Sequence, residues 1–288
     1  MIYSYDFEKK LNELISSALE EDIGDGDHST LACIDPLVEG KAVLKIKDHG
    51  IIAGIDIAEK IFSYTDHSSM LTRHKQDGEL VIPGEIAFEI EGKICHILST
   101  ERLVLNCMQR MSGIATLTKK YVERLTGYHT KLLDTRKTTP NFRLLEKEAV
   151  RIGGGFNHRF GLYDMIILKD NHIDYCGGIE KAINKAWQYV RDKKPGLKIE
   201  VETRNIEDVK NVIRIGKVDR IMLDNFMPGQ IAEAIQLIGG QYETEASGGI
   251  NYENIEKYAA TGVDFISSGA IIHHSTSLDL SLKAHLIQ

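Results

Sequence analysis

Short apolar runs alternate with longer amphipathic stretches along the second half of the chain. From residue 130 onward each run is rich in leucine or β-branched residues and is followed by a segment with helical spacing. This alternation is typical of parallel strands joined by crossover helices, and it predicts an α/β barrel. The expected strands are 130–135, 164–170, 198–203, 220–224, 242–247 and 265–269.

Polar, proline and glycine residues between these runs mark the ends of the expected helices. Asparagine favours the N-cap, proline the first turn, and glycine the position after the last turn. The residues at such positions are Asn205 and Asn251, Pro228, and Gly216, Gly239 and Gly262.

The first part of the chain has a weaker pattern. It predicts an amphipathic helix over 11–19, alternating strand segments over 40–54 and 85–99, and a long helix over 101–125 that leads into the barrel.

Composition narrows the function classes. The chain has 288 residues, of which 42% are hydrophobic and 27% charged, so it can bury a large core without disulfide or metal staples. Its net charge of −7 argues against nucleic-acid or membrane partners. No apolar run approaches the ~18 residues of a membrane span. The four cysteines form no Cys-x-x-Cys pair, and no secretory pattern opens the chain, so we expect a cytoplasmic protein with reduced thiols.

Most of the expected strands end in charged or small polar residues. In βα barrels the carboxyl ends of the strands form the active face, so these residues should converge there. A solvated rim would explain any one of them, but their recurrence favours a shared site. They are Arg136 and Lys137, Lys169, Glu202, Asp224, Ser247, and Ser268 with Gly269.

Positive charge is concentrated in one region of this acidic chain. Residues 131–172 contain eight Lys or Arg and five Asp or Glu. Guanidinium and ammonium groups bind carboxylates and phosphates, so an anionic small molecule is the expected ligand. Helical spacing assigns Arg143, Lys147 and Arg151 to a solvated helix face. The better candidates are Arg136, Lys137, Arg159 and Lys169.

Two glycine-bearing turns, 247–249 and 268–270, follow successive late strands, where barrels often bind phosphate through backbone N–H groups. The glycines at 153–155 have the spacing of neither a P-loop nor a dinucleotide fingerprint. Glu202 and Asp224 could hold Mg²⁺ or grip ribose hydroxyls, or they could form a plain acidic rim.

An ordered set of short strings resembles the quinolinate phosphoribosyltransferase family. The strings follow one another along most of the chain, and the set is far more specific than any member. They are Glu21-Asp22-Ile23-Gly24 with Gly26-Asp27 and Thr30, Thr100-Glu101-Arg102, Asp134-Thr135-Arg136-Lys137-Thr138 with Pro140, Gly153-Gly154-Gly155 through Asn157-His158-Arg159, Lys169-Asp170-Asn171-His172, Glu200-Val201-Glu202, Leu223-Asp224-Asn225 and Ser247-Gly248-Gly249-Ile250. Thr139 departs from the family, where many relatives have an apolar residue, and we expect only local packing consequences.

The resemblance implies an enzyme that joins quinolinate to 5-phosphoribosyl-1-pyrophosphate, releasing pyrophosphate and CO₂ and leaving nicotinate mononucleotide for NAD biosynthesis. It implies Mg²⁺ and an N-terminal α/β sandwich followed by an incomplete α/β barrel. It also implies a homodimer or larger homo-oligomer, in which the N-terminal domain of one subunit covers the barrel mouth of the other. We expect the sandwich over 1–113, the barrel over 114–270, and a tail over 271–288 that packs back on the sandwich.

The resemblance also assigns roles to residues. Arg136, His158 and Arg159 would face the two quinolinate carboxylates, helped by Thr135 and by Arg102 from the partner subunit. Catalysis would fall to Lys137 and Lys169, between the substrates, and to Glu202 and Asp224, which would address ribose hydroxyls and Mg²⁺. The 5-phosphate would be bound by Ser247, Gly248, Gly249, Ser268 and Gly269, with His274 just beyond the last turn.

Three alternatives remain open at this point. Lys169 could be the Schiff-base lysine of an aldolase. A relative of the same fold could work in molybdate transport or prefer nicotinate, although the pairs Arg136-Lys137 and His158-Arg159 favour a dicarboxylate. The chain could also bind the ligand without turnover. A zinc site at His273-His274 is not expected, because adjacent side chains diverge.

Overall fold

The computed structural model describes residues 5–285 and divides into two compact units. Unit 1 comprises residues up to 119, residues 138–154 and residues from 274 onward; unit 2 comprises 120–137 and 155–273. The sequence assigned the whole of 114–270 to the barrel, whereas the structure groups 114–119 and 138–154 with unit 1. Residues 271–273, expected in the tail, belong to unit 2. Among residues 5–285, none of the helices combines the length and apolar character needed to cross a membrane.

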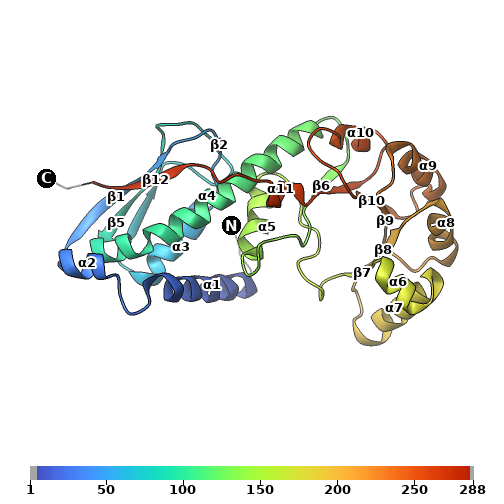
Figure 1. The fold of residues 1–288 in the computed structure, drawn as a ribbon, viewed down its shortest axis with the longest axis horizontal. Helices are drawn as coiled ribbons and strands as arrows, with labels where there is room; N and C mark the ends of the chain where they lie inside the picture. Colours follow the sequence, from blue (N-terminus) through green and yellow to red (C-terminus); the bar gives the residue numbers. More distant parts are fainter. Residues whose placement is uncertain (1–4, 286–288) are drawn as a thin grey trace. The chain divides into compact units, whose positions relative to one another are not determined.

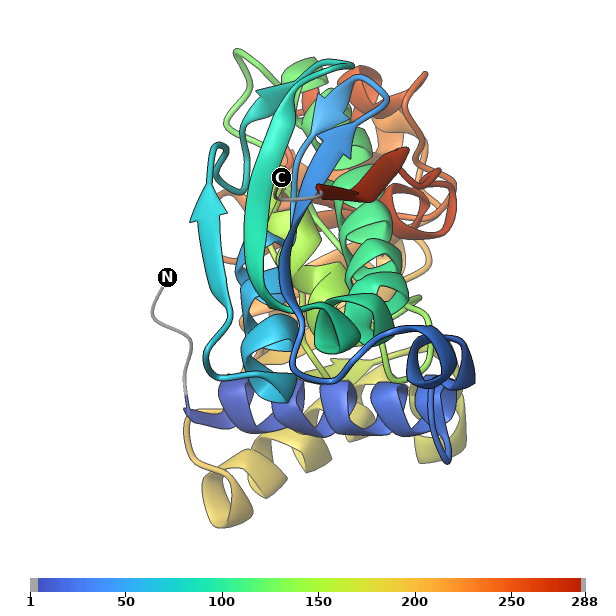
Figure 2. The same ribbon diagram turned by 90° about the vertical axis from the view of Figure 1, so that its left-hand side faces the viewer.

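Unit 1 is built on a four-stranded antiparallel sheet (Figure 1; Figure 2). The strand order is β12-β1-β5-β3, where β12 is Leu280–His285, β1 Glu39–Ile46, β5 Ile86–Lys93 and β3 Met70–Arg73. Leu44 pairs with Leu282 on one side and Phe88 on the other, so the C-terminal segment completes the N-terminal sheet. A two-stranded ribbon joins β2, Gly50–Ile51, to β4, Leu80–Val81.

Five helices belong wholly or mainly to unit 1. Two of them, α3 and α4, lie against one face of the sheet (Figure 2). The side chains of Leu44, Phe88 and Ile90 from the sheet and Ile57 and Ile61 from α3 are fully buried, which makes this core apolar. The helices are α1 (Tyr5–Ile23), α2 (His28–Cys33), α3 (Ile55–Thr65), α4 (Ile94–Arg124) and α5 (Arg143–Ile152).

Unit 2 is an open series of six parallel strands with helices on its outer side (Figure 1). The order is β6-β11-β10-β9-β8-β7. The strands are β6 (Lys131–Leu133), β7 (Ile166–Leu168), β8 (Ile199–Thr203), β9 (Arg220–Asp224), β10 (Glu243–Ser247) and β11 (Phe265–Ser267). Each lies within or at one end of an expected run, and β6 and β7 form the two edges, as in an incomplete barrel.

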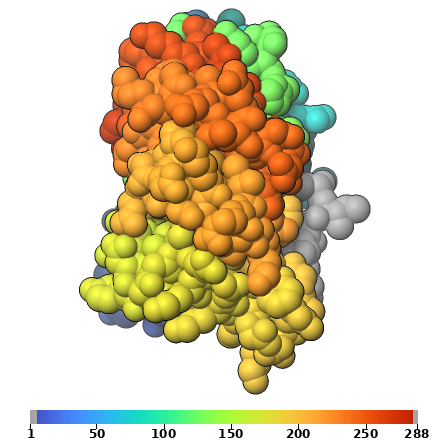
Figure 3. Space-filling view, turned by 90° about the vertical axis from the view of Figure 1, so that its right-hand side faces the viewer, coloured from blue at the N-terminus to red at the C-terminus, as the bar shows by residue number. Residues whose placement is uncertain are grey.

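Helices cover the outside of this sheet in chain order, and Figure 3 shows their segments succeeding one another across the surface. They are α6 (Asp170–Cys176), α7 (Ile179–Lys193), α8 (Ile206–Ile215), α9 (Pro228–Ile238) and α10 (Ile255–Ala259). The short helix α11 (Ala270–His273) follows β11 and lies apart from this outer row (Figure 1). The Asn205 side chain caps α8 by accepting a hydrogen bond from Asp208 N, as predicted, and Pro228 is the first residue of α9. Gly216 and Gly239 are C-caps, also as predicted.

Several local expectations were wrong. The N-cap of α10 is Asn254 and not Asn251. Residues 94–99, expected as strand, begin α4, because β5 ends at Lys93 and Ile97 and Thr100 then turn inward with helical spacing. Lys147, assigned to a solvated helix face, is only 2% exposed, since α5 buries every residue from Leu145 to Val150.

Candidate active site

Charged and small polar side chains follow one another along the carboxyl edge of the parallel sheet. Each strand contributes its last residues or the turn just after it, and the hydrogen-bonded strand order fixes their sequence along the edge. In that order the edge carries Lys169 after β7, Glu202 in β8, Asp224 in β9, Ser247 in β10, Ser268 and Gly269 after β11, and Arg136 and Lys137 after β6. Residues far apart in the sequence therefore share one edge.

Lys169, Glu202 and Asp224 form an interacting group on three adjacent strands. Lys169 Nζ lies 3.5 Å from Glu202 Oε2. Burial raises the pKa of Glu202, and the charge of Asp224 adds to this effect while Lys169 opposes it. Burial likewise raises the pKa of Asp224, against the effects of Lys169 and of a hydrogen bond from Ser247. Glu202 is buried and Asp224 is partly exposed, and both carboxylates supply hard oxygen donors of the kind that Mg²⁺ prefers.

Arg136 and Arg159 form a second group, and both carry positive charge. Burial lowers the pKa of the Arg159 guanidinium, and the charge of Arg136 lowers it further. Arg159 Nη1 also donates a hydrogen bond to Met165 O at 3.0 Å, which fixes part of the side chain. A bound anion would relieve the repulsion between the two guanidinium groups, so their proximity suits a carboxylate ligand.

The loop after β6 carries Lys137 toward the turn after β11. Lys137 N donates to Thr135 Oγ1 at 3.0 Å, a local turn that orients the two residues. A Cβ atom at Gly269 would lie 3.1 Å from Lys137 Cδ, so the absence of a side chain at Gly269 leaves room for the lysine. The two predicted site residues are therefore neighbours.

The turn after β10 requires glycine. Gly248 has φ +95, and a Cβ there would come within 2.8 Å of Asn225 N. Asn225 N in turn donates to Ser247 O at 2.8 Å, which ties the turns after β9 and β10 together. Gly249, with φ +62, has open space around it, as a backbone approached by a ligand needs. In contrast, Ser268 is 3% exposed and its hydroxyl donates to Ile250 O, so its side chain is used within the fold.

The His158 ring is buried against one face of the parallel sheet, between two glutamate carboxylates. Its side chain is 6% exposed, and Nε2 is 3.0 Å from Glu200 Oε2 and 3.1 Å from Glu245 Oε2, two fully buried side chains. Arg220 Nη1 donates to Glu245 Oε2 at 3.0 Å. Burial raises the pKa of Glu200, whereas for Glu245 the contacts with His158, Ser267 and Arg220 outweigh burial and lower the pKa.

Two observations bear on the protonation of His158. Burial lowers its pKa, but the contacts with the two carboxylates outweigh this and raise the pKa to about 9. On the other hand, Nδ1 accepts a hydrogen bond from Arg159 N at 2.7 Å, which requires a lone pair on Nδ1. The hydrogen bond is the more direct constraint, so in this arrangement the ring proton is on Nε2.

His158, Glu200 and Glu245 have ligand atoms within 4.8 Å of one another, as a metal site would need. The histidine tautomer, however, does not suit a metal there. A neutral histidine that binds a metal through Nε2 carries its proton on Nδ1 and donates it to an acceptor. Here Nδ1 faces a donor, and Arg220 already supplies a positive charge to Glu245. The donor set of Glu202 and Asp224 fits a cation better.

Sequence reasoning missed this buried ionic cluster. A signal was available: Glu200 and Glu202 on β8, and Glu243 and Glu245 on β10, are two residues apart and therefore point to one face of the sheet.

Two predicted site residues, Arg102 and His274, belong to unit 1. Arg102 is exposed on α4, and His274 follows the short helix α11. The remaining predicted site residues all belong to unit 2.

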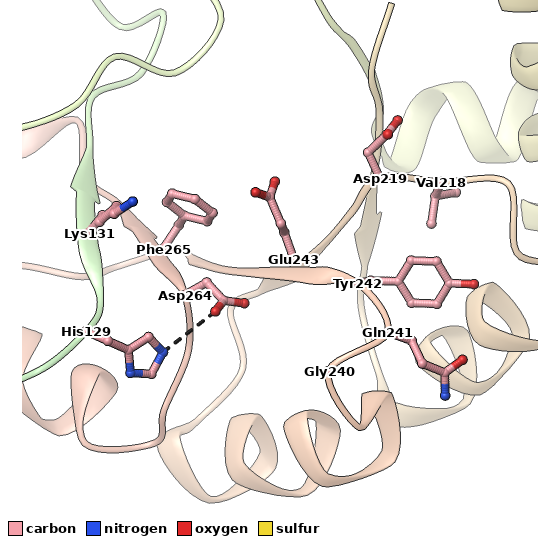
Figure 4. Close-up of a pocket in the computed structure, with 10 residues that line it drawn as sticks. All are labelled: His129, Lys131, Val218, Asp219, Gly240, Gln241, Tyr242, Glu243, Asp264 and Phe265. Atoms are coloured by element: carbon pink, nitrogen blue, oxygen red, sulfur yellow. Dashed lines mark ion pairs between the residues drawn. The ribbon is translucent and has the colours of Figure 1, made fainter.

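A pocket of about 780 Å³ lies at the opposite, amino end of the sheet (Figure 4). It is lined by Glu243 and Phe265 at the starts of β10 and β11, with His129 paired to Asp264 and with Tyr242 nearby. Its acidic groups already have partners: Glu243 accepts from Arg220, and Asp264 from Thr244. The pocket is thus separate from the residues at the carboxyl edge.

Comparisons with known proteins match both parts of the chain. The family models described as quinolinate phosphoribosyl transferase, N-terminal domain and C-terminal domain, match residues 27–112 and 114–283. A decarboxylating quinolinate phosphoribosyltransferase 1 of Nicotiana glauca is 44% identical over 288 residues, covering 95% of this chain and 82% of that protein. A probable carboxylating nicotinate-nucleotide pyrophosphorylase of Bacillus subtilis (strain 168) is 42% identical over 277 residues, covering 96% and 94%. The crystal structure of NadC from Streptococcus pyogenes is similar with a TM-score of 0.90, at 39% identity and 98% coverage of both chains.

Proposed function

The chain belongs to the quinolinate phosphoribosyltransferase family, and from that premise we propose that it transfers the phosphoribosyl group of 5-phosphoribosyl-1-pyrophosphate to quinolinate. The transfer is coupled to decarboxylation, and its products are nicotinate mononucleotide, pyrophosphate and CO₂. The enzyme is a pentosyltransferase of NAD biosynthesis. The observation that carries the proposal is the row of charged residues at the carboxyl edge of the sheet, where two close guanidinium groups suit a dicarboxylate.

Arg136 and Arg159 bind the quinolinate carboxylates, with Thr135 and His158 beside them. Lys137 and Lys169 lie between the two substrates, where their charges stabilise the pyrophosphate oxygens as negative charge develops on them. Glu202 and Asp224 address the ribose hydroxyls. The turns that contain Ser247, Gly248, Gly249 and Gly269 offer backbone N–H donors to the 5-phosphate, with His274 as a further candidate. Ser268 supports the second turn, because its N–H and hydroxyl both donate within the fold.

The side chains align the two anions so that the pyridine nitrogen faces the ribose C1 carbon. As pyrophosphate leaves, C1 becomes electron-poor and the ring nitrogen forms the new C–N bond. The alkylated ring nitrogen is cationic and stabilises the electron pair left on the adjacent ring carbon when its carboxylate departs as CO₂. That carbon then takes up a proton from water, which completes nicotinate mononucleotide. The protein therefore contributes mainly orientation and fixed charge, which together can lower a barrier by several kcal/mol.

Mg²⁺ belongs to this proposal. The carboxylates of Glu202 and Asp224, on adjacent strands, would hold it, because their oxygen atoms are the hard donors that suit this cation. When bound, it would neutralise charge on the departing pyrophosphate.

The functional unit in this proposal is a homodimer or larger homo-oligomer in the cytoplasm, with Arg102 reaching the partner's site. Mixing two inactive variants tests this. If Arg102→Ala and Lys137→Ala are unfolded and refolded together, half of the dimers are hybrids with one intact site, so activity returns to about a quarter of wild type. A mixture as inactive as its components would contradict shared sites.

Product analysis tests the reaction. The purified protein, incubated with quinolinate, 5-phosphoribosyl-1-pyrophosphate and Mg²⁺, should yield nicotinate mononucleotide by mass spectrometry. Omission of Mg²⁺ should abolish the product, and nicotinate in place of quinolinate should give little of it. Quinolinate that binds by calorimetry without any turnover would identify a ligand-binding relative instead.

A further inference from the structure

A short segment, 156–159, lies along the open edge of the parallel sheet and carries Arg159. Phe156 N donates to Leu132 O at 2.8 Å, and Asp134 N donates to Phe156 O at 3.0 Å, so the segment runs beside β6. At its other end, Arg159 Nη1 donates to Met165 O, just before β7. We name 156–159 the seam segment, because it connects the two edge strands of the sheet.

Asp134 fixes the main chain of the seam segment. This side chain has no exposed surface, and its two oxygens accept hydrogen bonds from His158 N at 2.9 Å and from Asn157 Nδ2 at 2.7 Å. Charge-assisted hydrogen bonds of this kind are stronger than neutral ones. The backbone just before Arg159 is therefore held from the β6 side.

The His158 ring provides a second anchor. Its Nδ1 accepts the hydrogen bond from Arg159 N at 2.7 Å, and its Nε2 faces Glu200 at 3.0 Å and Glu245 at 3.1 Å. The two carboxylates come from different strands, β8 and β10. A rotation of the ring would break contacts on both sides at once, so the ring can hold Arg159 N in one place.

The carboxylates are themselves held in place. Arg220 Nη1 donates to Glu245, and Arg220 Nη2 donates to Glu243 Oε2 at 3.0 Å. Glu245 is fully buried and Glu243 is 41% exposed, so only the first is committed to the interior. Glu243 is two residues before Glu245 on the same face of β10 and pairs with Arg220 without contacting the ring, which makes it a matched control.

We propose that Glu200 and Glu245 are positioning residues for quinolinate recognition. They lock the His158 ring, the ring fixes the main chain of Arg159, and the Arg159 guanidinium is thereby held beside Arg136. Two fixed guanidinium groups match a ligand with two adjacent carboxylates, so this buried cluster favours the dicarboxylate over a monocarboxylate. The inference rests on the proposed function and assigns part of its substrate specificity to residues that never touch the substrate.

Steady-state kinetics of Glu245→Gln test the proposal, with Glu243→Gln as the control. Loss of a positioning group lowers ground-state binding of the ligand that Arg159 contacts, so Glu245→Gln should raise KM for quinolinate about tenfold with little change in kcat. KM for 5-phosphoribosyl-1-pyrophosphate should change by less than about twofold, and Glu243→Gln should leave both KM values within about twofold of wild type. The ratio of kcat/KM for quinolinate over nicotinate should fall only in Glu245→Gln.

Glu200→Gln keeps the proposal testable if Glu245→Gln does not fold. Glutamine has nearly the same shape as glutamate, so it can occupy this fully buried position while it removes the charge that faces His158 Nε2. The same selective rise in KM for quinolinate is expected. A folded variant with an unchanged KM for quinolinate, or with equal increases in both KM values, would overturn the positioning role. Wild-type protein without activity on quinolinate would instead overturn the proposed function, and this inference with it.

Discussion

The antiparallel sheet of unit 1 and the parallel sheet of unit 2 enclose side chains of opposite character. In unit 1 the fully buried residues Leu44, Phe88 and Ile90 pack hydrocarbon against hydrocarbon. In unit 2 the face of the sheet that packs on the helices is also apolar, but the opposite face holds Glu200 and Glu245 with the His158 ring and Arg220. Burial of apolar area stabilises a fold directly, whereas buried ion pairs roughly offset their own desolvation cost. The difference suggests that the ionic interior is kept for orientation of the site and contributes little net stability.

The largest effect is expected when one member of the ionic cluster of unit 2 is removed. Arg220→Leu should lower the free energy of unfolding by about 3–5 kcal/mol, because it leaves the buried Glu245 carboxylate without its cation. Urea denaturation measures the loss. Arg214→Leu is the matched control, since this arginine pairs with Glu180 on the surface and should cost under about 1 kcal/mol. Equal effects of the two variants would contradict a buried, interdependent cluster.

In the apolar unit, the corresponding change is Phe88→Ala. Phe88 is fully buried and packs edge-on against Phe62, with ring centroids 6.2 Å apart. Its truncation should cost about 3–4 kcal/mol by cavity formation. The KM for quinolinate, measured well below the melting temperature, should stay as in wild type. A selective change in that KM would mean that the apolar core also orients the site.

A third change affects the carboxyl edge itself. Lys137→Ala and Arg136→Ala should each lower turnover about 100-fold, equivalent to about 2.7 kcal/mol, because charge facing the substrates is lost. Their unfolding free energies should stay within about 0.5 kcal/mol of wild type, since both side chains are exposed. Lys198→Ala, at the opposite end of the sheet, is the control and should turn over normally. Wild-type turnover in Arg136→Ala or Lys137→Ala would remove that residue's role.

The smallest expected effect concerns a buried charge in unit 1. Burial raises the pKa of Asp77 to about 6, against the hydrogen bond that it accepts from Ile55 N at the start of α3. A raised pKa in the folded state means that stability is lost as pH rises from about 4 to about 6. Asp77→Asn keeps the acceptor and removes the charge. Because solvent screens this partly exposed side chain, the variant should be more stable than wild type by about 1–2 kcal/mol above pH 6 and equal to it below pH 4. If the free energies of unfolding of wild type and Asp77→Asn differed by the same amount at every pH from 4 to 6, the raised pKa of Asp77 would be contradicted.

The positions of the parallel strands could be predicted because each strand is a short apolar run with turn residues on both sides. Residues 220–224 form β9, as expected, and the strand ends with Lys169, Glu202 and Asp224 do share one edge. The ionic cluster around Glu200 and Glu245 was not predictable. The alternation of residues along a strand shows which side chains share a face of the sheet, but it does not show that this face is buried and ionic. Lys147 was misassigned for a similar reason: helical spacing describes a face and says nothing about what covers it.

The candidate site shows the same division. The positions of Lys169 and Glu202 at strand ends were enough to place them together, whereas the grouping of Arg136 with Arg159 came from the family resemblance. The contacts of His158 depend on Glu200 and Glu245, which lie on strands distant in sequence, so no local pattern connects them. That β12 pairs with β1 was equally beyond local pattern, because the two strands come from opposite ends of the chain.

The most direct test of the account follows the fate of the two quinolinate carboxylates in a single turnover. Quinolinate labelled in the carboxylate next to the ring nitrogen is mixed with enzyme, 5-phosphoribosyl-1-pyrophosphate and Mg²⁺, in parallel with quinolinate labelled in the other carboxylate. The account predicts that the first label leaves as CO₂ only when 5-phosphoribosyl-1-pyrophosphate is present, while the second stays in nicotinate mononucleotide. Retention of both labels, or release of CO₂ without the phosphoribosyl donor, would contradict it.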